Sequence, residues 1–279
     1  TEGTVTGTIT SGTTIAAMLD SSSGLTETDA YTITIAAGDA EVTATNLTAL
    51  YGKTSVAVDA SAVTQITGTV AEANIVYGAG SSEITGLGNE IVVTTESSLT
   101  DVTALNTLDG NTTGTVNTAS ITSVTGTLAK LLTAYGSNGI TGLGNEAITV
   151  SDTTSLAASD LNSLDSKTSG TVTTSTSLAT LTGTVAELNT AYGSSGLSIE
   201  GDEAITISDT TVDAETLNVL NNYTSGVINA DTLTKLTGAL VDVNVAFAAD
   251  ALASGATISG LGAQDVELTD TNILAADLD

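Results

Sequence analysis

The stretch LTGTVAELNTAYGSSG at residues 181–196 decides the fold, because related copies of it recur along the chain. ITGTVAEANIVYGAG begins at Ile66, VTGTLAKLLTAYGSNG at Val124, and a looser copy, LTGALVDVNVAFA, at Leu236. A marker glycine follows the threonine in each copy, at Gly68, Gly126, Gly183 and Gly238. Repetition at a fixed period is typical of arrays in which each repeat packs on its neighbours.

A second repeated element alternates with the first. ITVSDTTSLAASDLNSLDSKTSG begins at Ile148, and related stretches begin at Ile33, Ile91 and Ile205. Superposing both elements on their shared Leu-Asn core predicts a column of buried residues: Leu47, Ala73, Leu105, Leu131, Leu161, Leu188, Leu217 and Val243, extended by Ala16 and Leu278. We therefore predict about ten coils of roughly 28 residues, paired into double repeats near 57 residues.

These patterns predict a repeat solenoid: a stack of parallel β-strands with short helices and glycine-rich turns, of the β-solenoid or α/β-solenoid type. It is expected to be one continuous array. Its predicted divisions are an N-terminal partial coil at 1–32, repeats at 33–90, 91–147, 148–204 and 205–265, and a truncated fifth repeat at 266–279.

Each coil is expected to contain a strand followed by a helix. In ITVSD the apolar residues alternate with polar ones, which predicts Ile148 and Val150 inward and Thr149 and Ser151 outward. GTVNTAS from residue 114 and GTVTTSTS from residue 170 read as weaker strands.

The helix signal follows in TVAELNTAYG, where Val185, Leu188 and Ala191 share one helical face. Thr184 with Glu187, and Thr69 with Glu72, fit a capping box, while Gly193 and Gly110 are expected to end their helices.

The spacing of strands and helices conflicts. Strands stack about 4.8 Å apart but helices need about 8–10 Å, so we expect alternate helices to lie on opposite sides.

Composition excludes several classes of function. The chain has four Lys and Arg against 32 Asp and Glu, a formal net charge of -28, and neither His nor Cys. Binding to nucleic acid or to anionic membrane requires basic patches, so neither is expected. Without Cys or His, disulfides and zinc sites are excluded. The N-terminal TEGTVTGT resembles neither a Sec signal nor a membrane anchor.

Two columns of carboxylates are candidate calcium ligands, because oxygen ligands from turns are what calcium prefers. One column follows the glycine-rich turns and contains Glu90, Glu146, Glu203 and Asp265. The other lies at strand ends and contains Asp152, Asp209 and Asp270. A solvated acidic edge is the alternative interpretation, and calcium is the one cofactor considered.

Aromatic and asparagine residues also recur once per repeat. A packing ladder is predicted for Tyr77, Tyr135, Tyr192 and Phe247, with a glycan-binding strip as the alternative. An asparagine ladder that satisfies turn amides is predicted for Asn74, Asn106, Asn162, Asn189, Asn218 and Asn244. GKT at residues 52–54 lacks the glycine of a phosphate-binding loop and is read as chance.

Catalysis is not expected. Triads that need His or Cys cannot form, and every acidic residue sits in a repeated context, whereas an active site needs differently tuned groups.

Three strings carry a resemblance to a known family. LAASDLNSLDSKTSGTV at 156–172, TLTGTVAELNTAYGSSG at 180–196 and GITGLGNEAITVSDT at 139–153 resemble the tandem units of long repeat-rich surface proteins of bacteria, particularly marine cyanobacteria. The resemblance covers nearly the whole chain from about residue 32. It implies export and an extracellular or cell-surface structural role.

The predicted function is therefore a segment of a surface fibre, surface layer or adhesin stalk. Both ends read as partial coils, which predicts self-association end to end with other copies. The alternative is a ligand-binding solenoid on the cell surface that binds ice or glycan. Ice binding would require one flat, regular array of Thr149, Thr173 and Thr206.

Overall fold

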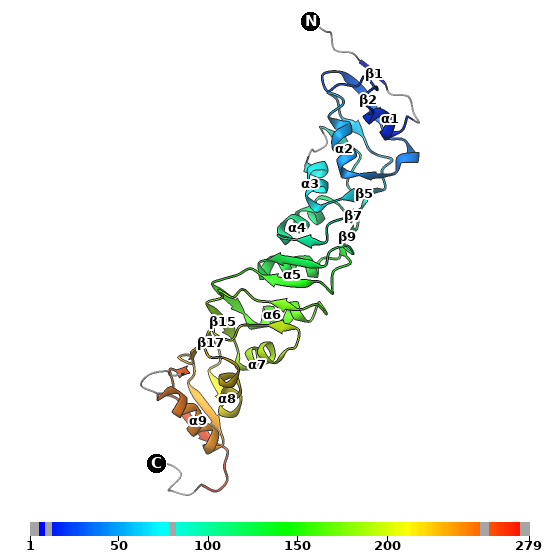
Figure 1. The fold of residues 1–279 in the computed structure, drawn as a ribbon. Helices are drawn as coiled ribbons and strands as arrows, with labels where there is room; N and C mark the ends of the chain where they lie inside the picture. Colours follow the sequence, from blue (N-terminus) through cyan, green and yellow to red (C-terminus); the bar gives the residue numbers. More distant parts are fainter. Residues whose placement is uncertain (1–5, 9–12, 79–81, 252–256, 274–279) are drawn as a thin grey trace. The chain divides into compact units, whose positions relative to one another are not determined.

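The computed structural model describes residues 6–8, 13–78, 82–251 and 257–273. These residues form an α/β fold with nine α-helices and several parallel sheets, an arrangement compatible with a repeat (Figure 1). The chain divides into two compact units, one formed by Thr1–Thr125 with Thr133–Glu146 and the other by Gly126–Leu132 with Ala147–Asp279. A helix, the strand before it and the short strand after it together form what we call a repeat unit.

The first compact unit contains a five-stranded sheet in the order β3, β5, β7, β9, β11, with every neighbouring pair parallel. Its strands are β3 (Glu41–Thr43), β5 (Gln65–Gly68), β7 (Ile91–Thr94), β9 (Val116–Asn117) and β11 (Ile140–Thr141). A second sheet joins β1 (Thr6–Thr8), β2 (Ala30–Thr34), β4 (Val58–Asp59) and β6 (Ile84–Thr85), and a third pairing joins β8 (Ser98–Leu99) with β10 (Ser123–Gly126). Its helices are α1 (Ile15–Leu19), α2 (Ala44–Tyr51), α3 (Val70–Gly78) and α4 (Val102–Asn111), with a 3-10 turn at Ala37–Asp39.

The second compact unit repeats this arrangement. A five-stranded sheet contains β13 (Ser155–Ala157), β15 (Thr180–Gly183), β17 (Ala204–Ile207), β19 (Ile228–Asn229) and β21 (Ile258–Ser259). Smaller groups are β12 (Ala147–Val150) with β14 (Val172–Thr173) and β16 (Leu197–Ser198), and β18 (Thr211–Asp213) with β20 (Lys235–Gly238) and β22 (Asp265–Leu268). Its helices are α6 (Ala158–Asp165), α7 (Val185–Gly193), α8 (Ala214–Tyr223) and α9 (Leu240–Asp250); α5 spans Leu128–Gly136.

The predicted core column is confirmed for its eight central positions, which are all buried, from Leu47 through Val243. At the N-terminal end the prediction is wrong: Ala16 is exposed, and Ile15 and Met18 are the buried residues of α1. The error has a local cause, because α1 has five residues and no Leu-Asn core by which to set the register. Leu278 lies outside the described residues.

The strand and helix patterns are confirmed where they are strongest. Ile148 and Val150 are buried while Thr149 and Ser151 are exposed, and the Thr184–Glu187 capping box is complete. At the other capping box, the Thr69 N–H donates to Glu72 Oε2 at 2.8 Å. That hydrogen bond lowers the pKa of Glu72.

The predicted C-cap glycines are wrong. Gly193 is the last residue of α7 and Ser194 is its C-cap, while Gly110 lies inside α4. Neither glycine adopts a positive φ, so neither supplies the left-handed conformation that a C-cap glycine provides.

The prediction that alternate helices lie on opposite sides is also wrong. Consecutive helices pack directly on one another, α2 on α3 and α3 on α4 in the first compact unit, and α6 through α9 in the second (Figure 1). The division of the strands among several sheets resolves the conflict of spacing. Between α7 and α9, β16 belongs to one sheet, β17 and β19 to a second, and β18 and β20 to a third. No single sheet therefore has to match the wider spacing of the helices along the whole unit.

Candidate functional site

The strand-end carboxylates bind the helix of the preceding repeat unit. Asp152 Oδ2 accepts from the Leu128 N–H at 2.7 Å, and Asp209 Oδ2 accepts from the Val185 N–H at 2.7 Å. Leu128 and Val185 are the first residues of α5 and α7, so each carboxylate meets the unsatisfied amides and positive dipole of a helix N-terminus. Asp270 Oδ2 does the same for the Leu240 N–H of α9 at 2.6 Å.

Two further members of this column were not predicted. Glu96 accepts from the Val70 N–H at 2.7 Å, and Asp39 accepts from the Ile15 N–H at 3.2 Å. The signal was present as an acidic residue shortly after each strand. Glu96 was missed because the stretch IVVTTESS was aligned one residue out of register with ITVSDTTS.

The glutamates of the other predicted column are buried and bound to tyrosine. Tyr77 Oη donates to Glu90 at 2.9 Å, and Tyr135 Oη donates to Glu146 at 2.8 Å. Tyr192 Oη donates to Glu203 at 3.1 Å, and the Gly201 N–H donates to the same oxygen at 3.0 Å. Each pair ties the end of a helix to the turn before the next strand.

The environment of these tyrosines changes their acidity. Burial raises the pKa of Tyr77, Tyr135 and Tyr192 well above the ordinary tyrosine value. The neighbouring glutamate raises it further, because a tyrosinate would face a carboxylate. The three hydroxyls are therefore hydrogen-bond donors at neutral pH.

Asp265 does not belong to this column. Strand pairing matches Leu236 with Val266, as it matches Leu181 with Ile205, so Gln264 occupies the place of Glu203. Gln264 Oε1 accepts from the Gly262 N–H at 2.6 Å, while Asp265 is exposed. The prediction erred because an acidic residue follows the glutamine directly. The repeat that has Gln264 in place of glutamate also has Phe247 in place of tyrosine. The two positions therefore change together.

We expect this coupling to be measurable in the third repeat. Tyr192→Phe should destabilise the chain by about 1–3 kcal/mol, because it removes the hydroxyl that donates to the buried Glu203 carboxylate. Glu203→Gln alone should also destabilise it, because a neutral amide oxygen is a weaker acceptor than a carboxylate. The double variant, which copies the Phe and Gln of the fourth repeat, should lose less than the sum of the two. Urea unfolding of the four proteins measures the difference, and strictly additive losses would contradict the pairing.

The asparagines bind carbonyls rather than turn amides, so that detail of the prediction is wrong. Asn74 Nδ2 donates to the Ala104 carbonyl at 2.8 Å, and Asn218 Nδ2 donates to the Asp242 carbonyl at 2.9 Å. Asn162 and Asn189 make the same bond to Glu187 and Thr216, at 2.9 and 3.0 Å. In every case the acceptor is the third residue of the following helix. Asn244, on α9, is exposed.

A buried threonine of the repeated T-S-G stretch was missed. Thr224 Oγ1 donates to the Gly201 carbonyl at 3.1 Å and accepts from the Gly226 N–H at 2.9 Å. Thr54, in the GKT string, donates to the Tyr31 carbonyl at 2.7 Å and accepts from the Tyr31 N–H at 3.0 Å. The recurrence of this threonine in successive repeats was the signal in the sequence that could have identified it.

The threonines considered for ice binding do not form one array. Thr149 pairs with Thr173 between β12 and β14, whereas Thr206 lies on β17, in a different sheet, and pairs with Thr182 and Asn229. These three threonines therefore do not form the single regular array that ice binding would require.

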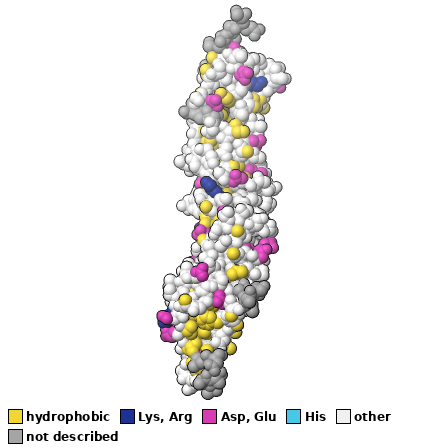
Figure 2. Space-filling model, turned by 90° about the vertical axis from the view of Figure 1, so that its left-hand side faces the viewer, with side chains coloured by type: hydrophobic (Ala, Val, Ile, Leu, Met, Phe, Trp, Pro, Cys, Tyr) yellow, Lys and Arg dark blue, Asp and Glu magenta, His cyan; other side chains and the backbone are white. Residues whose placement is uncertain are grey.

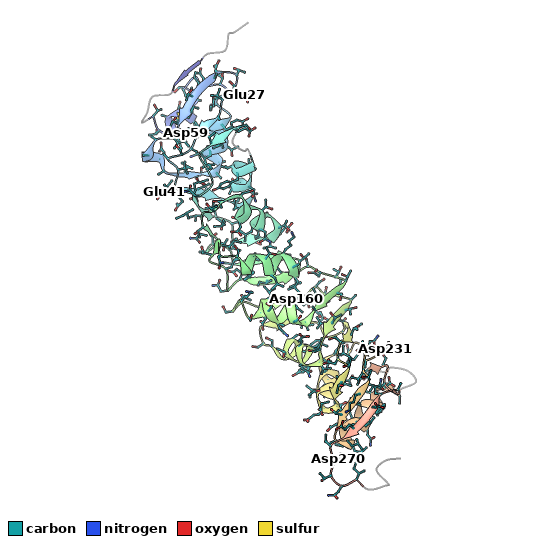
Figure 3. The ribbon with its side chains drawn as sticks, turned by 180° about the vertical axis from the view of Figure 1, so that it is seen from behind. Glu27, Glu41, Asp59, Asp160, Asp231 and Asp270 are labelled. Carbon is teal, nitrogen blue, oxygen red and sulfur yellow. The ribbon has the colours of Figure 1, made fainter. Side chains whose placement is uncertain are left out.

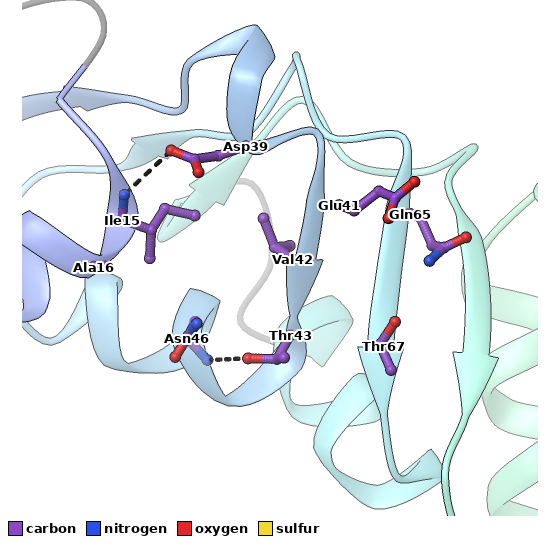
Figure 4. Close-up of a pocket in the computed structure, with 9 residues that line it drawn as sticks. All are labelled: Ile15, Ala16, Asp39, Glu41, Val42, Thr43, Asn46, Gln65 and Thr67. Atoms are coloured by element: carbon purple, nitrogen blue, oxygen red, sulfur yellow. Dashed lines mark hydrogen bonds between the residues drawn. The ribbon is translucent and has the colours of Figure 1, made fainter.

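One pocket of about 410 Å³ lies in the first compact unit, beside the short helix α1 (Figure 4). Its lining residues are Ile15, Ala16, Asp39, Glu41, Val42, Thr43, Asn46, Gln65 and Thr67. Asp39 already holds the Ile15 N–H, and Thr43 Oγ1 accepts from the Asn46 N–H at 3.1 Å. Asp39 and Thr43 therefore bind backbone amides in the first turns of α1 and α2.

The acidic residues are dispersed over the repeat units. Within the second compact unit, Asp160 lies on α6, Asp231 follows β19 and Asp270 follows β22 (Figure 3). Among the residues that the structure describes, no group of three or more His, Cys, Asp or Glu could hold a metal ion. The calcium assignment stays a prediction.

We expect calcium to add little stability. Asp152, Asp209 and Asp270 each use an oxygen to cap a helix, and the glutamates are buried. Millimolar CaCl2 should therefore raise Tm no more than NaCl of equal ionic strength, since both screen the charge. Differential scanning calorimetry compares the two salts. A larger rise with calcium would show specific binding, because a ligand of the folded state stabilises it by RT ln(1 + [L]/Kd).

Comparisons with protein-family models, curated proteins and solved structures find no match. No helix in the described ranges is long and apolar enough to cross a membrane.

Proposed function

We propose that this chain is a structural repeat module of the solenoid type, whose recurrent polar residues hold each coil to the next. One observation carries this proposal: the recurrent Asp, Glu and Asn side chains, some of which are candidate ligands by sequence, form hydrogen bonds with neighbouring repeat units. Asp209 binds the preceding helix, Asn218 binds the following helix, and Glu203 fastens the turn between them.

Close packing between repeat units supports the solenoid. A Cβ on Gly183 would lie 3.2 Å from Ala158 Cβ, the first residue of the preceding helix. A Cβ on Gly68 would lie 3.0 Å from Ala44 Cβ, so the marker glycine of the repeat allows a helix to approach the strand of the next coil.

The proposed biological role is that of an extracellular fibre, surface layer or adhesin stalk, in which copies also associate end to end. A solenoid supplies such roles because its length grows with each repeat while its contacts remain local. The recurrent carboxylates either cap a helix or pair with a tyrosine, and equivalent carboxylates make the same contact in successive repeats. This uniformity agrees with a non-enzymatic role. Catalysis requires groups tuned differently from one another.

The location can be tested on the cells that make the protein. Antibodies raised against the chain should label intact cells, because the proposal places the epitopes outside. The matched control is an antibody against a cytoplasmic protein of the same cells, which should label them only after permeabilisation. Labelling of this chain only after permeabilisation would contradict the surface role.

A further inference from the structure

Exposed hydrophobic side chains gather in the last repeat units of the second compact unit. Of the nine large exposed hydrophobic residues in the described part of the chain, six lie between Val219 and Val266. On the face drawn in Figure 2, hydrophobic side chains gather near the C-terminal end of the described chain and are scattered elsewhere. Four of the six form what we call the valine face: Val219 and Tyr223 on α8, and Val241 and Val245 on α9.

The valine face lies on the outer side of two adjacent helices. Val219 and Tyr223 are four residues apart, as are Val241 and Val245, so each pair occupies one side of its helix. Val241 is 67% exposed and Val245 51% exposed, while Val243 and Ala246 on the opposite side are buried. Tyr223 stacks on Tyr192 of α7, with ring centroids 6.1 Å apart, which fixes its exposed ring.

Packing within the chain does not require these residues. The equivalent positions of the preceding repeat hold Ser163 on α6, Lys167 just after the end of α6, and Ala186 and Thr190 on α7. The buried positions are apolar in both repeats, for example Leu161 and Leu217. The buried positions therefore exchange one apolar residue for another, as Leu188 and Val243 do, whereas on the outer side Ser163, Lys167 and Thr190 are replaced by large apolar residues. Valine in place of Ala186 also lowers helix propensity.

We propose that the valine face is a contact with a second copy of this chain in an antiparallel dimer. The chain carries a formal charge of -28, so copies repel one another over most of their surface. The valine face contains no charged side chain and lacks the lysine of the preceding repeat. An uncharged apolar patch is complementary to itself under two-fold symmetry.

Charge selects the antiparallel arrangement. Glu215 lies one turn before Val219 on α8 and is exposed at the N-terminal edge of the valine face. Parallel packing would bring the two Glu215 carboxylates together, whereas antiparallel packing places them at opposite ends of the contact. In the antiparallel dimer Val241 of each copy meets Val245 of the other.

The contact is weak and depends on salt. Standard interfaces use about 20–30 residues a side, far more than the valine face offers. Raising NaCl from about 0.1 to 1 M shortens the screening length from about 10 to 3 Å and removes most of the repulsion. The fraction of dimer should therefore increase with salt, whereas a contact between opposite charges would weaken.

The test is sedimentation equilibrium of the whole chain at both salt concentrations, with a triple variant that restores the residues of the preceding repeat. Val219→Ser, Val241→Ala and Val245→Thr together should raise the dimer dissociation constant roughly tenfold or more. The matched control removes three exposed apolar residues of the first compact unit, Val56→Thr, Ile75→Thr and Ile91→Thr, and should dimerise as the parent does.

The mass of the assembly separates this inference from end-to-end association. The valine face adds a pairing step that the triple variant removes, whereas end-to-end stacking adds continued growth that the triple variant does not affect. A parent that stays monomeric at 1 M salt at the highest attainable concentration overturns the proposal. So does a triple variant that dimerises as strongly as the parent.

Discussion

Replacing Leu188 with Asp should unfold the second compact unit or leave it close to unfolding. Leu188 is fully buried on the packed face of α7, which lies between α6 and α8. The introduced carboxylate would have no buried cation to pair with, because none of the four lysines, Lys53, Lys130, Lys167 and Lys235, is buried. An unpaired buried charge costs several kcal/mol, and a whole domain is stable by only about 5–15 kcal/mol.

Circular dichroism during urea unfolding measures this loss. Ala186→Asp is the matched control, because Ala186 is exposed in the first turn of the same helix, where a negative charge is favourable. If Leu188→Asp unfolds at the same urea concentration as the parent, Leu188 does not lie in a packed column and the repeat register is wrong.

Replacing Gly226 with Ala should have an effect of similar size for a steric reason. A Cβ at this position would lie 1.9 Å from the carbonyl oxygen of Glu203 and 2.6 Å from its carbonyl carbon. Both are backbone atoms, and the adjoining hydrogen bonds, Ser225 N to Gly201 O at 2.7 Å and Ile205 N to Val227 O at 2.9 Å, hold the two segments together. Relief of the clash must break these bonds, so we expect a loss of about 2–4 kcal/mol.

Gly110→Ala provides the control. No atom lies within 4 Å of a Cβ at Gly110, which is inside α4, so alanine should stabilise that helix by up to about 1 kcal/mol. Thermal unfolding measures the melting temperatures of both variants and of the parent. Equal melting temperatures for Gly226→Ala and the parent would mean that the two segments are farther apart than described.

The packing of each repeat unit could be predicted from sequence because it depends on local periodicity. Ile148 and Val150 alternate with polar residues, and Val185, Leu188 and Ala191 recur at helical spacing, so burial follows from the pattern alone. The same reasoning failed at Ala16, where α1 is too short to display a period.

Contacts between repeat units could be predicted less well. The asparagine column is visible in the sequence, but its partners are carbonyls one helix away, about 25–30 residues along the chain, and no local pattern identifies them. The tyrosine and glutamate columns were likewise recognised separately. In the fourth repeat tyrosine is replaced by Phe247 and glutamate by Gln264, and this joint replacement was the signal in the sequence that the two side chains are in contact.

The arrangement of the helices could not be predicted because the sequence does not show how the strands are divided among sheets. Short strands such as β8 and β18 are two or three residues long and merge with the turns around them. For a single stack of strands, helices on opposite sides were the consistent solution. In the structure the strands of a compact unit belong to several sheets, and its helices pack in succession.

The central claim is that successive coils stack and that each is held by its neighbours, and removal of one whole double repeat tests it most directly. Deletion of residues 148–204 joins Ala147 to Ile205, which preserves the register because Ile205 is equivalent to Ile148. Small-angle X-ray scattering of the parent and the shortened chain should show two folded proteins. Their maximum dimensions should differ by the span of two helices, about 16–20 Å. A shortened chain that is unfolded, or that is folded with an unchanged maximum dimension, would contradict the solenoid.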